Sequence, residues 1–233
     1  KVDLALGDSE FNRRELEKVG YPRTGVLPLL LNLSRFDQKE NHVIRNIFSN
    51  GKWTILFVGR IIPNKKFEDV IKIFYFYKKY FNQNSQLILA GDYRGTERYF
   101  AALQDLVDRL KLKDVHFPGH IEFSELISFF KLADVYVSMS EHEGFGVPLL
   151  EAFYNKVPVV AFAAGAVEET MNNGGLLLHK KNLFKTAAVL DKFNRDEIFR
   201  MEIVSSQVEA LKKYDRDNVT RILLEHIERI RKE

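Results

Sequence analysis

Residues 133–162 read ADVYVSMSEHEGFGVPLLEAFYNKVPVVAF and contain two apolar runs separated by a glycine loop and a short amphipathic segment. The runs Val135–Met139 and Val157–Phe162 have the nearly continuous apolar character of strands that are covered on both faces. Pro148–Tyr154 reads as a helix, and Pro148 suits its first turn because the φ angle of proline is already helical. This order predicts two parallel strands joined by a helix.

The same alternation continues on both sides of this stretch. Further strand candidates are Trp53–Val58, Gln86–Ala90, Asp114–Phe117 and Leu176–Leu178, and further helix candidates are Lys66–Phe81, Glu97–Leu110 and Glu125–Leu132, the last with Ser124 as N-cap. From Asn182 onward the pattern is all helical. We therefore predict an α/β fold, a Rossmann-like doubly wound parallel sheet with C-terminal helices. Such sheets bind ligands beyond the carboxyl ends of their strands.

The first residues form a unit of their own. Val2–Leu6 reads as a strand and Ser9–Val19 as a helix with Ser9 as N-cap. A single strand–helix unit cannot bury both of its faces. We therefore expect it to belong to a neighbouring domain that is largely missing from this chain.

The composition excludes several classes of function. The 233 residues contain no cysteine, which rules out disulfides, thiolate catalysis and cysteine-ligated zinc. The net charge is only +3 and basic residues are mixed with acidic ones, so we do not expect nucleic acid as a partner. No apolar run approaches the roughly 20 residues of a membrane span, although the basic excess leaves peripheral membrane contact open.

The glycine loop has the residue types of a phosphate and sugar site. Glu143 precedes Gly144 and Gly146, and Glu151 lies about one turn inside the following helix. Glycines let a ligand approach the backbone, and the free amides of a helix N-terminus favour phosphate. Two carboxylates facing one crevice can accept hydrogen bonds from the vicinal diols of sugars and riboses. Alternatively, the acidic residues only complement the helix dipole. The loop also lacks the third glycine of a dinucleotide fingerprint, so its glycines alone are weak evidence for a binding site.

Glu143, seven intervening residues and Glu151, with Gly-Phe-Gly directly after the first Glu, resemble the signature of the retaining glycosyltransferases of the large group-1 family, which have the GT-B fold. Residues 152–161, AFYNKVPVVA, look like the continuation of that signature. Residues 57–65, FVGRIIPNK, are similar to the family's Gly-Arg…Lys element, but Lys66 stands where the family usually has glycine. The resemblance covers nearly the whole chain.

The resemblance implies a role for each charged residue. Arg60 and Lys65, on the loop that begins at Gly59, would contact the donor diphosphate. Glu143 would hold the transferred sugar as the catalytic-site carboxylate, and Glu151 would hold the ribose diol. For Lys65, a solvated lysine at the start of a helix remains the alternative.

The remaining site residues would act through their backbone or near the base. Gly144, Phe145 and Gly146 would bring backbone amides to the sugar or the diphosphate. Gly119 and His120 would lie where family loops approach the base, although an ordinary exposed-loop histidine remains open for His120.

The resemblance also assigns the regions of the chain. Residues 1–25 would be the tail of a truncated N-terminal acceptor domain, 26–36 the interdomain linker, 37–213 the donor-binding domain, and 214–233 a helix that packs back toward the N-terminal domain. The expected protein is a retaining hexosyltransferase that uses a nucleotide sugar, without metal or other cofactor, on a glycan or lipid-linked acceptor. We expect it in the cytoplasm, with contact to the cytoplasmic face of a membrane left open. This fragment alone should be inactive, because family members take a glycine-rich loop and a histidine from the N-terminal domain.

Other functions remain as alternatives. A non-catalytic nucleotide-binding or interaction module could keep the same fold, and GT-B epimerases and phosphorylases also exist. The only Asp-x-Asp sequence, Asp215-Arg-Asp217, lies at the edge of the terminal helix, where chance explains it. The six histidines are scattered without the spacing of a zinc helix, so no metal site is expected.

Overall fold

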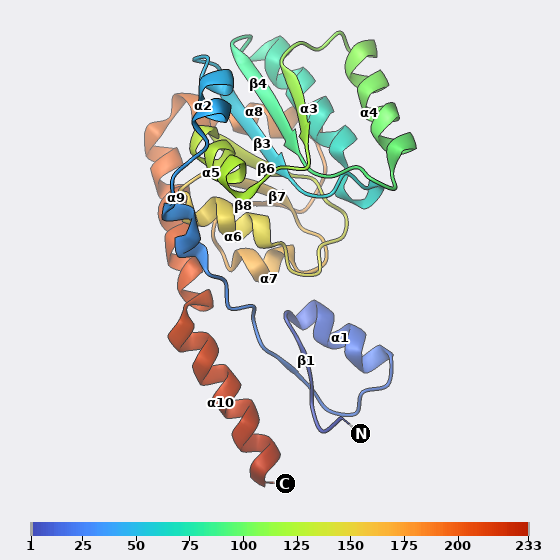
Figure 1. Cartoon of the computed structure of the whole chain (residues 1–233), viewed down its shortest axis with the longest axis vertical. Coiled ribbons are helices and arrows are strands. Elements are labelled where there is room, and N and C mark those ends of the chain that lie inside the picture. The colour runs from blue at the N-terminus through green and yellow to red at the C-terminus, as the bar shows by residue number, and fades with distance from the viewer. Residues whose placement is uncertain (1, 233) are drawn as a thin grey trace.

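The computed structural model describes residues 2–232, and its main body is a six-stranded parallel sheet in the order β5-β4-β3-β6-β7-β8 (Figure 1). The strands are β3 (Trp53–Val58), β4 (Ser85–Ala90), β5 (Val115–Gly119), β6 (Val135–Ser138), β7 (Val159–Phe162) and β8 (Leu176–Leu178). The chain enters this sheet at β3 in its middle, continues outward through β4 to β5, and returns to β6 beside β3. This order confirms the predicted doubly wound fold and places a topological switch point between β3 and β6.

Helices cover both faces of this sheet (Figure 1). They are α2 (His42–Phe48), α3 (Phe67–Tyr80), α4 (Glu97–Arg109), α5 (Phe123–Leu132), α6 (Val147–Tyr154), α7 (Val167–Met171), α8 (Leu183–Arg195) and α9 (Glu197–Leu211). Helix α3 packs against α4 and α8, whereas α5 packs against α2, and α6 against α9. In Figure 1, α5 and α6 lie in front of the sheet and α3 and α8 behind it.

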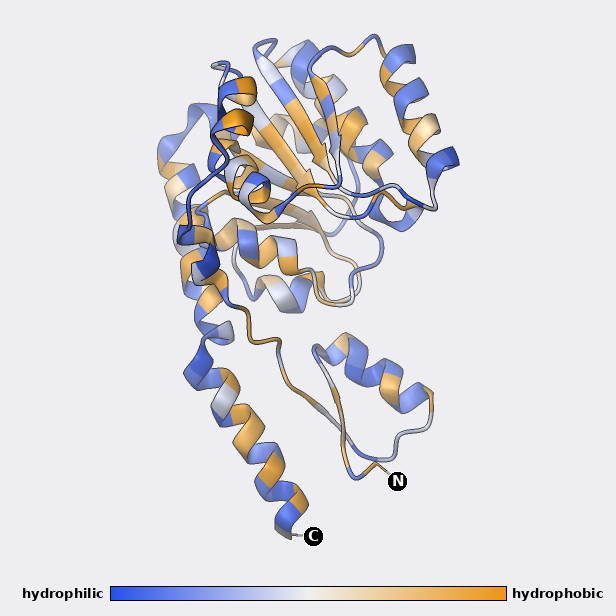
Figure 2. Cartoon of the chain, viewed as in Figure 1, coloured by the Kyte–Doolittle hydropathy of each residue, from blue (hydrophilic) through white to orange (hydrophobic). Residues whose placement is uncertain are grey.

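The apolar core lies between these layers (Figure 2). Ile55 and Leu56 of β3 and Val135 and Val137 of β6 have no exposed surface. Burial of each such side chain contributes roughly 1.5–3 kcal/mol. The core therefore holds the two strands at the switch point, and the loops that follow them, in a fixed position.

The predicted bounds of the sheet strands agree with the structure to within two residues. The largest differences are at β5, which ends at Gly119 and not at Phe117, and at β7, which begins at Val159 and not at Val157. The Val157 amide donates to the carbonyl of Ala152 at 3.0 Å and so belongs to the end of α6.

The prediction of Ser124 as the N-cap of α5 was wrong. The helix begins at Phe123, and Glu122 caps it. The Glu122 amide donates to the Glu125 carboxylate at 2.7 Å, while the Glu122 side chain accepts from the amide of Glu125. The reciprocal pair of glutamates therefore outweighs the single serine hydroxyl. The short helices α2 and α7 were not predicted.

A separate two-stranded sheet carries the N-terminal residues (Figure 1). It consists of β1 (Ala5–Gly7) and β2 (Thr24–Val26), joined by α1 (Glu10–Lys18), and the long helix α10 (Arg216–Lys232) runs beside it. The strand predicted over Val2–Leu6 is thus shorter and shifted. Ser9 caps α1 as predicted, because its hydroxyl accepts from the Asn12 amide at 3.1 Å. His226 of α10 has its Nε2 2.9 Å from the carbonyl of Val26.

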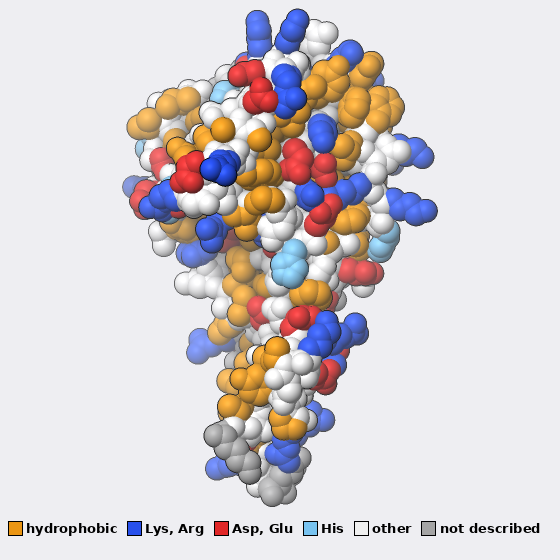
Figure 3. Space-filling model, turned by 90° about the vertical axis from the view of Figure 1, so that its right-hand side faces the viewer, with side chains coloured by type: hydrophobic (Ala, Val, Ile, Leu, Met, Phe, Trp, Pro, Cys, Tyr) orange, Lys and Arg blue, Asp and Glu red, His pale blue; other side chains and the backbone are white. Residues whose placement is uncertain are grey.

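The apolar face predicted for α10 is only partly covered. Val219 is buried, whereas Leu223, Ile227 and Ile230 are exposed. Among residues 2–232, every helix falls short of the length and apolarity that crossing a bilayer requires. On the face shown in Figure 3, lysine and arginine side chains are interspersed with acidic ones.

Candidate functional site

Three glycines bring the carboxyl ends of β3, β4 and β5 into contact. The Gly59 amide donates to the carbonyl of Ala90, and the Gly91 amide donates to the carbonyl of Gly119, each at 3.0 Å. A Cβ atom on Gly91 would lie 1.7 Å from the Gly59 oxygen, so no side chain fits there. Gly59 and Gly119, which were both predicted as site residues, therefore lie next to Gly91 and form with it the floor of the site at the carboxyl ends of these strands. Gly91 was not predicted as a site residue, although its place directly after β4 is a signal for one.

Lys65 and Glu143 meet beside the switch point. Lys65 ends the short 3-10 helix η2 (Pro63–Lys65) after β3, and Glu143 lies in the loop between β6 and α6. The Lys65 Nζ lies 2.6 Å from both carboxylate oxygens of Glu143. Both side chains are largely buried, with exposed fractions of 19% and 12%. The structure thus brings the two residues together, and Lys65 is not the solvated lysine of the alternative interpretation.

The backbone of the Glu143 loop is held from the segment that follows β7. Gly165 has a φ of 59°, and a Cβ on it would lie 2.3 Å from the Glu143 carbonyl oxygen. The same carbonyl accepts the Ala166 amide at 2.9 Å. The Thr170 hydroxyl donates to the carbonyl of Phe145 at 2.5 Å. These contacts fix the backbone of Glu143 and so limit the positions that its carboxylate can reach.

The Gly-Phe-Gly residues behave differently from one another. Gly146 has a φ of 93° and is the N-cap of α6, so no side-chain oxygen occupies the first amides of that helix. The Phe145 ring is buried and packs edge-on against Tyr214, with 5.6 Å between ring centroids. Phe145 can therefore offer a ligand only its backbone, and ligand binding by the amides of the three residues stays a prediction.

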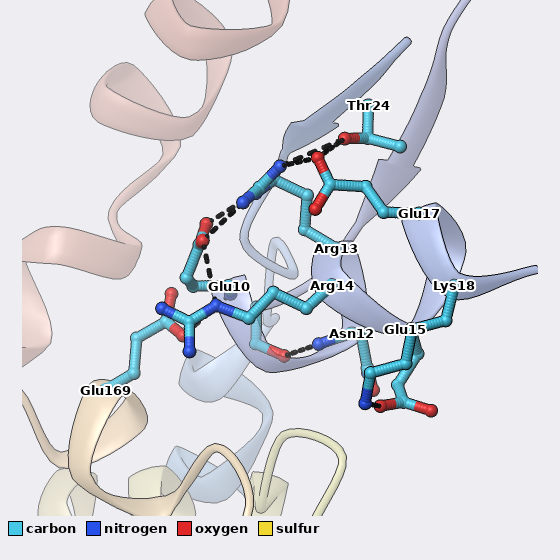
Figure 4. A network of polar contacts seen from close by, with 10 residues as sticks. Glu10, Asn12, Arg13, Arg14, Glu15, Glu17, Lys18, Thr24 and Glu169 are labelled. Carbon is cyan, nitrogen blue, oxygen red and sulfur yellow. Dashed lines mark hydrogen bonds and ion pairs between the residues drawn. The ribbon is translucent and has the colours of Figure 1, made fainter. Parts of the chain in front are cut away.

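The N-terminal unit contacts this same loop. The Gly144 carbonyl accepts the Ser9 hydroxyl at 2.9 Å and the Asn12 amide group at 3.2 Å. Between these two residues, the Glu10 amide donates to the Glu169 carboxylate at 2.7 Å, and Figure 4 shows the Glu169 side chain next to Glu10. Helix α1 is thereby held against the signature loop.

Glu151 lies in α6 with its side chain only 6% exposed. Its Oε1 accepts a hydrogen bond from Nη2 of Arg35 at 2.7 Å. Burial raises the pKa of Glu151 above its usual value, and the contact with Arg35 opposes that rise. Arg35 was not predicted, and its distance of 116 residues along the chain leaves no local signal for this pair.

Both glutamates of the signature lie near the buried phenol of Tyr136. Burial raises the pKa of Tyr136 well above its usual value, and the negative charges of Glu143 and Glu151 add to that rise. The Tyr136 hydroxyl donates to the carbonyl of Val58 at the end of β3. Both carboxylates therefore act on the same buried phenol, and their convergence on one ligand crevice stays a prediction.

The other predicted residues have fewer contacts. Arg60 and His120 are exposed, and neither side chain has a hydrogen bond or ion pair among residues 2–232. Lys66 adopts the left-handed region with a φ of 52°, a conformation that glycine reaches at little cost. Its ammonium lies 3.1 Å from Glu141, so its charge is compensated within the protein. Within residues 2–232, no group of three or more acidic or histidine side chains could hold a metal ion.

Comparison with known proteins decides the family. A profile of the family described as "Glycosyl transferases group 1" matches residues 38–214. The chain belongs to this family. The glycosyltransferase MJ1607 of Methanocaldococcus jannaschii, itself uncharacterized, is 30% identical over 218 residues, which are 91% of this chain and 54% of that protein. O-antigen chain mannosyltransferase B of Escherichia coli is 25% identical over 93% of this chain and 58% of that protein. The chain therefore spans about half the length of these curated relatives.

Solved structures show the same fold. Anabaena Alr3699/HepE in complex with UDP-glucose superimposes with a TM-score of 0.81 at 20% identity, covering 100% of this chain and 64% of that one. Sucrose-phosphate synthase from Thermosynechococcus elongatus gives a TM-score of 0.78 at 21% identity, covering 100% of this chain and 58% of that one. The group-1 glycosyltransferase chain thus has the predicted half of a GT-B fold.

Proposed function

We propose that this group-1 glycosyltransferase chain binds a nucleotide-diphosphate sugar at the carboxyl ends of β3–β6. The whole protein then transfers a hexose from that donor, with retention of configuration, to a glycan or lipid-linked acceptor. The contact between Lys65 and Glu143 beside the first turn of α6 carries this proposal. A cation suited to phosphate and a carboxylate suited to sugar hydroxyls lie together there, next to the N-terminus of a helix.

The charges of the site are suited to a diphosphate. Lys65 and Glu143 neutralise each other in the structure. A bound diphosphate would compete for the Lys65 ammonium and attract the exposed Arg60, because its oxygens carry a higher negative charge than one carboxylate. Glu143 would then accept hydrogen bonds from the hydroxyls of the sugar.

Backbone groups would supply the remaining contacts. In the first turn of α6, Pro148 has no amide hydrogen and the Leu149 amide donates to the Gly146 carbonyl at 2.9 Å. The Val147 amide is therefore the donor that a ligand could use, and the helix dipole favours an anion there. Gly144 and Phe145 would add amides from the loop. Gly59 and Gly119 would allow close approach of the nucleotide, with the exposed His120 beside the base. Glu151 would accept hydrogen bonds from the ribose hydroxyls.

In the transfer step, the acceptor oxygen would attack the anomeric carbon on the face from which the diphosphate leaves. The bond from this carbon to the diphosphate oxygen breaks as the bond to the acceptor oxygen forms. The acceptor proton passes to the departing diphosphate. In this mechanism Glu143 positions the sugar and stabilises developing positive charge, and no metal ion or other cofactor takes part.

The acceptor side belongs to the N-terminal part of the protein in this proposal. Residues 1–25 are the tail of that domain, 26–36 the linker, 37–213 the donor domain, and the exposed apolar face of 214–233 packs against the N-terminal domain. The chain by itself would bind the donor without turnover. Its relatives include proteins named O-antigen chain mannosyltransferases, which supports a glycan or lipid-linked acceptor and a cytoplasmic location, with peripheral membrane contact.

Calorimetric titration of the chain with UDP, GDP and ADP, without added metal, tests the donor site. Binding of one nucleotide in the micromolar to low-millimolar range supports the proposal and identifies the base. If none of them binds to the chain, and none binds to a longer form that contains the N-terminal domain, the nucleotide assignment is wrong. Glu143→Ala in the longer form tests catalysis: unchanged transfer would instead favour a non-catalytic role for this domain.

A further inference from the structure

Arg35 reaches the buried end of the site from the linker. It belongs to the 3-10 helix η1 (Leu33–Asp37), next to Phe36, which is 2% exposed. The Phe36 ring packs edge-on against Phe123 and Phe130, with centroid distances of 5.0 and 5.5 Å. The guanidinium carbon of Arg35 lies 4.3 Å from the Phe123 ring centroid. Arg35 is therefore held between an aromatic face and the Glu151 carboxylate.

The contact leaves Glu151 able to accept more hydrogen bonds. Arg35 is its one cationic contact among residues 2–232, and that contact uses a single position on Oε1. A carboxylate has about four acceptor positions, so the second position of Oε1 and both positions of Oε2 remain. A ribose diol donates two hydrogen bonds, which fits this number.

We propose that Arg35 is a positioning residue for the ribose of the donor: it holds Glu151 ionised and oriented so that the carboxylate accepts both ribose hydroxyls. This inference rests on the proposed function. It adds a linker residue to a site that is otherwise built from the donor domain.

The bound ribose would not displace Arg35. Ribose hydroxyls are neutral, so they cannot compensate the charge of a carboxylate that is buried to this degree. A guanidinium is suited to the position because it is planar and always charged, and because it can stack on Phe123 while donating to Glu151. A lysine would keep the charge but lose the stacking and the fixed direction of the donor.

Removal of Arg35 should also change the pH dependence of binding. Burial raises the pKa of Glu151 and Arg35 opposes this rise, while the buried Tyr136 of β6 is a further titratable group that interacts with Glu151. Without Arg35 the pKa of Glu151 rises further. The protonated carboxyl accepts fewer hydrogen bonds, so nucleotide affinity should begin to fall at a higher pH in the variant than in the wild type as the solution is acidified.

The competing explanation is that Arg35 only fastens the linker to the donor domain and has no effect on ribose binding. Tyr154 offers the matched control, because its hydroxyl donates to the Asp37 carboxylate at 2.9 Å and so ties the same linker to α6. Tyr154→Phe removes that tie and leaves Glu151 unchanged. It should therefore affect stability without affecting nucleotide recognition.

The test compares Arg35→Gln, Arg35→Lys and Tyr154→Phe with the wild-type chain, by calorimetry with UDP, GDP and ADP and with the 2′-deoxy form of the nucleotide that binds. We expect Arg35→Gln to weaken binding about tenfold at pH 7, Arg35→Lys to recover part of it, and Tyr154→Phe to bind like the wild type. The wild type should prefer the ribonucleotide over its 2′-deoxy form, and Arg35→Gln should lose much of that preference. If Arg35→Gln keeps the affinity, the ribose preference and the pH profile of a folded wild type, the role of Arg35 is overturned while the donor site stands. If neither the wild-type chain nor a longer form that contains the N-terminal domain binds any of the three nucleotides, both this role and the proposed donor site are overturned.

Discussion

Lys65 and Glu143, 78 residues apart in the sequence, form a contact in which one ammonium nitrogen lies 2.6 Å from both carboxylate oxygens. The loops after β3 and β6 carry the two residues, and these strands are neighbours only because the chain reverses its winding direction between them. The fold therefore creates the ion pair at the switch point, where ligands of doubly wound sheets bind.

Replacement of Lys65 separates its structural role from its binding role. In Lys65→Met the Glu143 carboxylate stays largely buried without its partner, which should cost about 3 kcal/mol of unfolding free energy. The double variant Lys65→Met, Glu143→Gln removes the unpaired charge and should recover most of that stability. Both variants should bind a nucleoside diphosphate more weakly than the wild type, because both lack the Lys65 ammonium. Urea denaturation and calorimetry measure the two quantities. A double variant as unstable as the single one would argue against a direct pairing energy.

The floor of the site should not tolerate a methyl group at Gly91. The Cβ of Gly91→Ala would lie 1.7 Å from the carbonyl oxygen of Gly59, so β3 and β4 would have to separate at their ends. We expect a loss of about 3 kcal/mol or more in unfolding free energy. Gly59→Ala is the matched control, because its nearest contact would be the Phe57 ring at 3.9 Å. Thermal denaturation of both variants checks this, and equal melting temperatures would contradict it.

The central strands could be predicted from the sequence, but only some of the contacts across the site could. The bounds of β3 were correct because Trp53–Val58, apolar except for Thr54, is bounded by Lys52 and Gly59. The approach of Lys65 to Glu143 could be predicted because parallel strands end at one edge. Arg35 could not be assigned to Glu151, because a linker has no periodicity that indicates where its side chains point. The capping of α5 was also missed, since a serine hydroxyl and a glutamate pair are both local signals and only packing decides between them.

Lys66 provides a test of backbone strain. Its φ of 52° favours glycine, while its contact with Glu141 is partly exposed and contributes little. Lys66→Gly should therefore be at least as stable as the wild type. Lys66→Ala loses the ion pair but keeps the strain, so it should be about 1 kcal/mol less stable than Lys66→Gly. Chemical denaturation of the two variants measures this difference. Alanine equal to glycine would mean that residue 66 adopts another conformation.

Asp114 should link stability to acid pH. Burial works to raise the pKa of Asp114, but hydrogen bonds from Lys52 and Lys78 outweigh it, so that the pKa lies below its usual value. A lowered pKa in the folded state stabilises the protein above the unfolded pKa of about 3.9, and this contribution is lost as the pH falls through the folded value. Asp114→Asn removes the charge and keeps a side chain that tolerates the φ of 64° at this position.

We therefore expect Asp114→Asn to be less stable than the wild type at pH 7, by up to about 1 kcal/mol because solvent screens this partly exposed group. The difference should shrink below about pH 4 and vanish once the pH has fallen through the lowered folded pKa of Asp114, because both proteins then lack the Asp114 charge. Asp105→Asn is the control, since its ion pair with Arg109 is exposed on both sides and should contribute almost nothing at either pH. Urea denaturation from pH 2 to 7 gives the comparison. A difference between Asp114→Asn and the wild type that stays constant over this range would show that the charge of Asp114 is not its source.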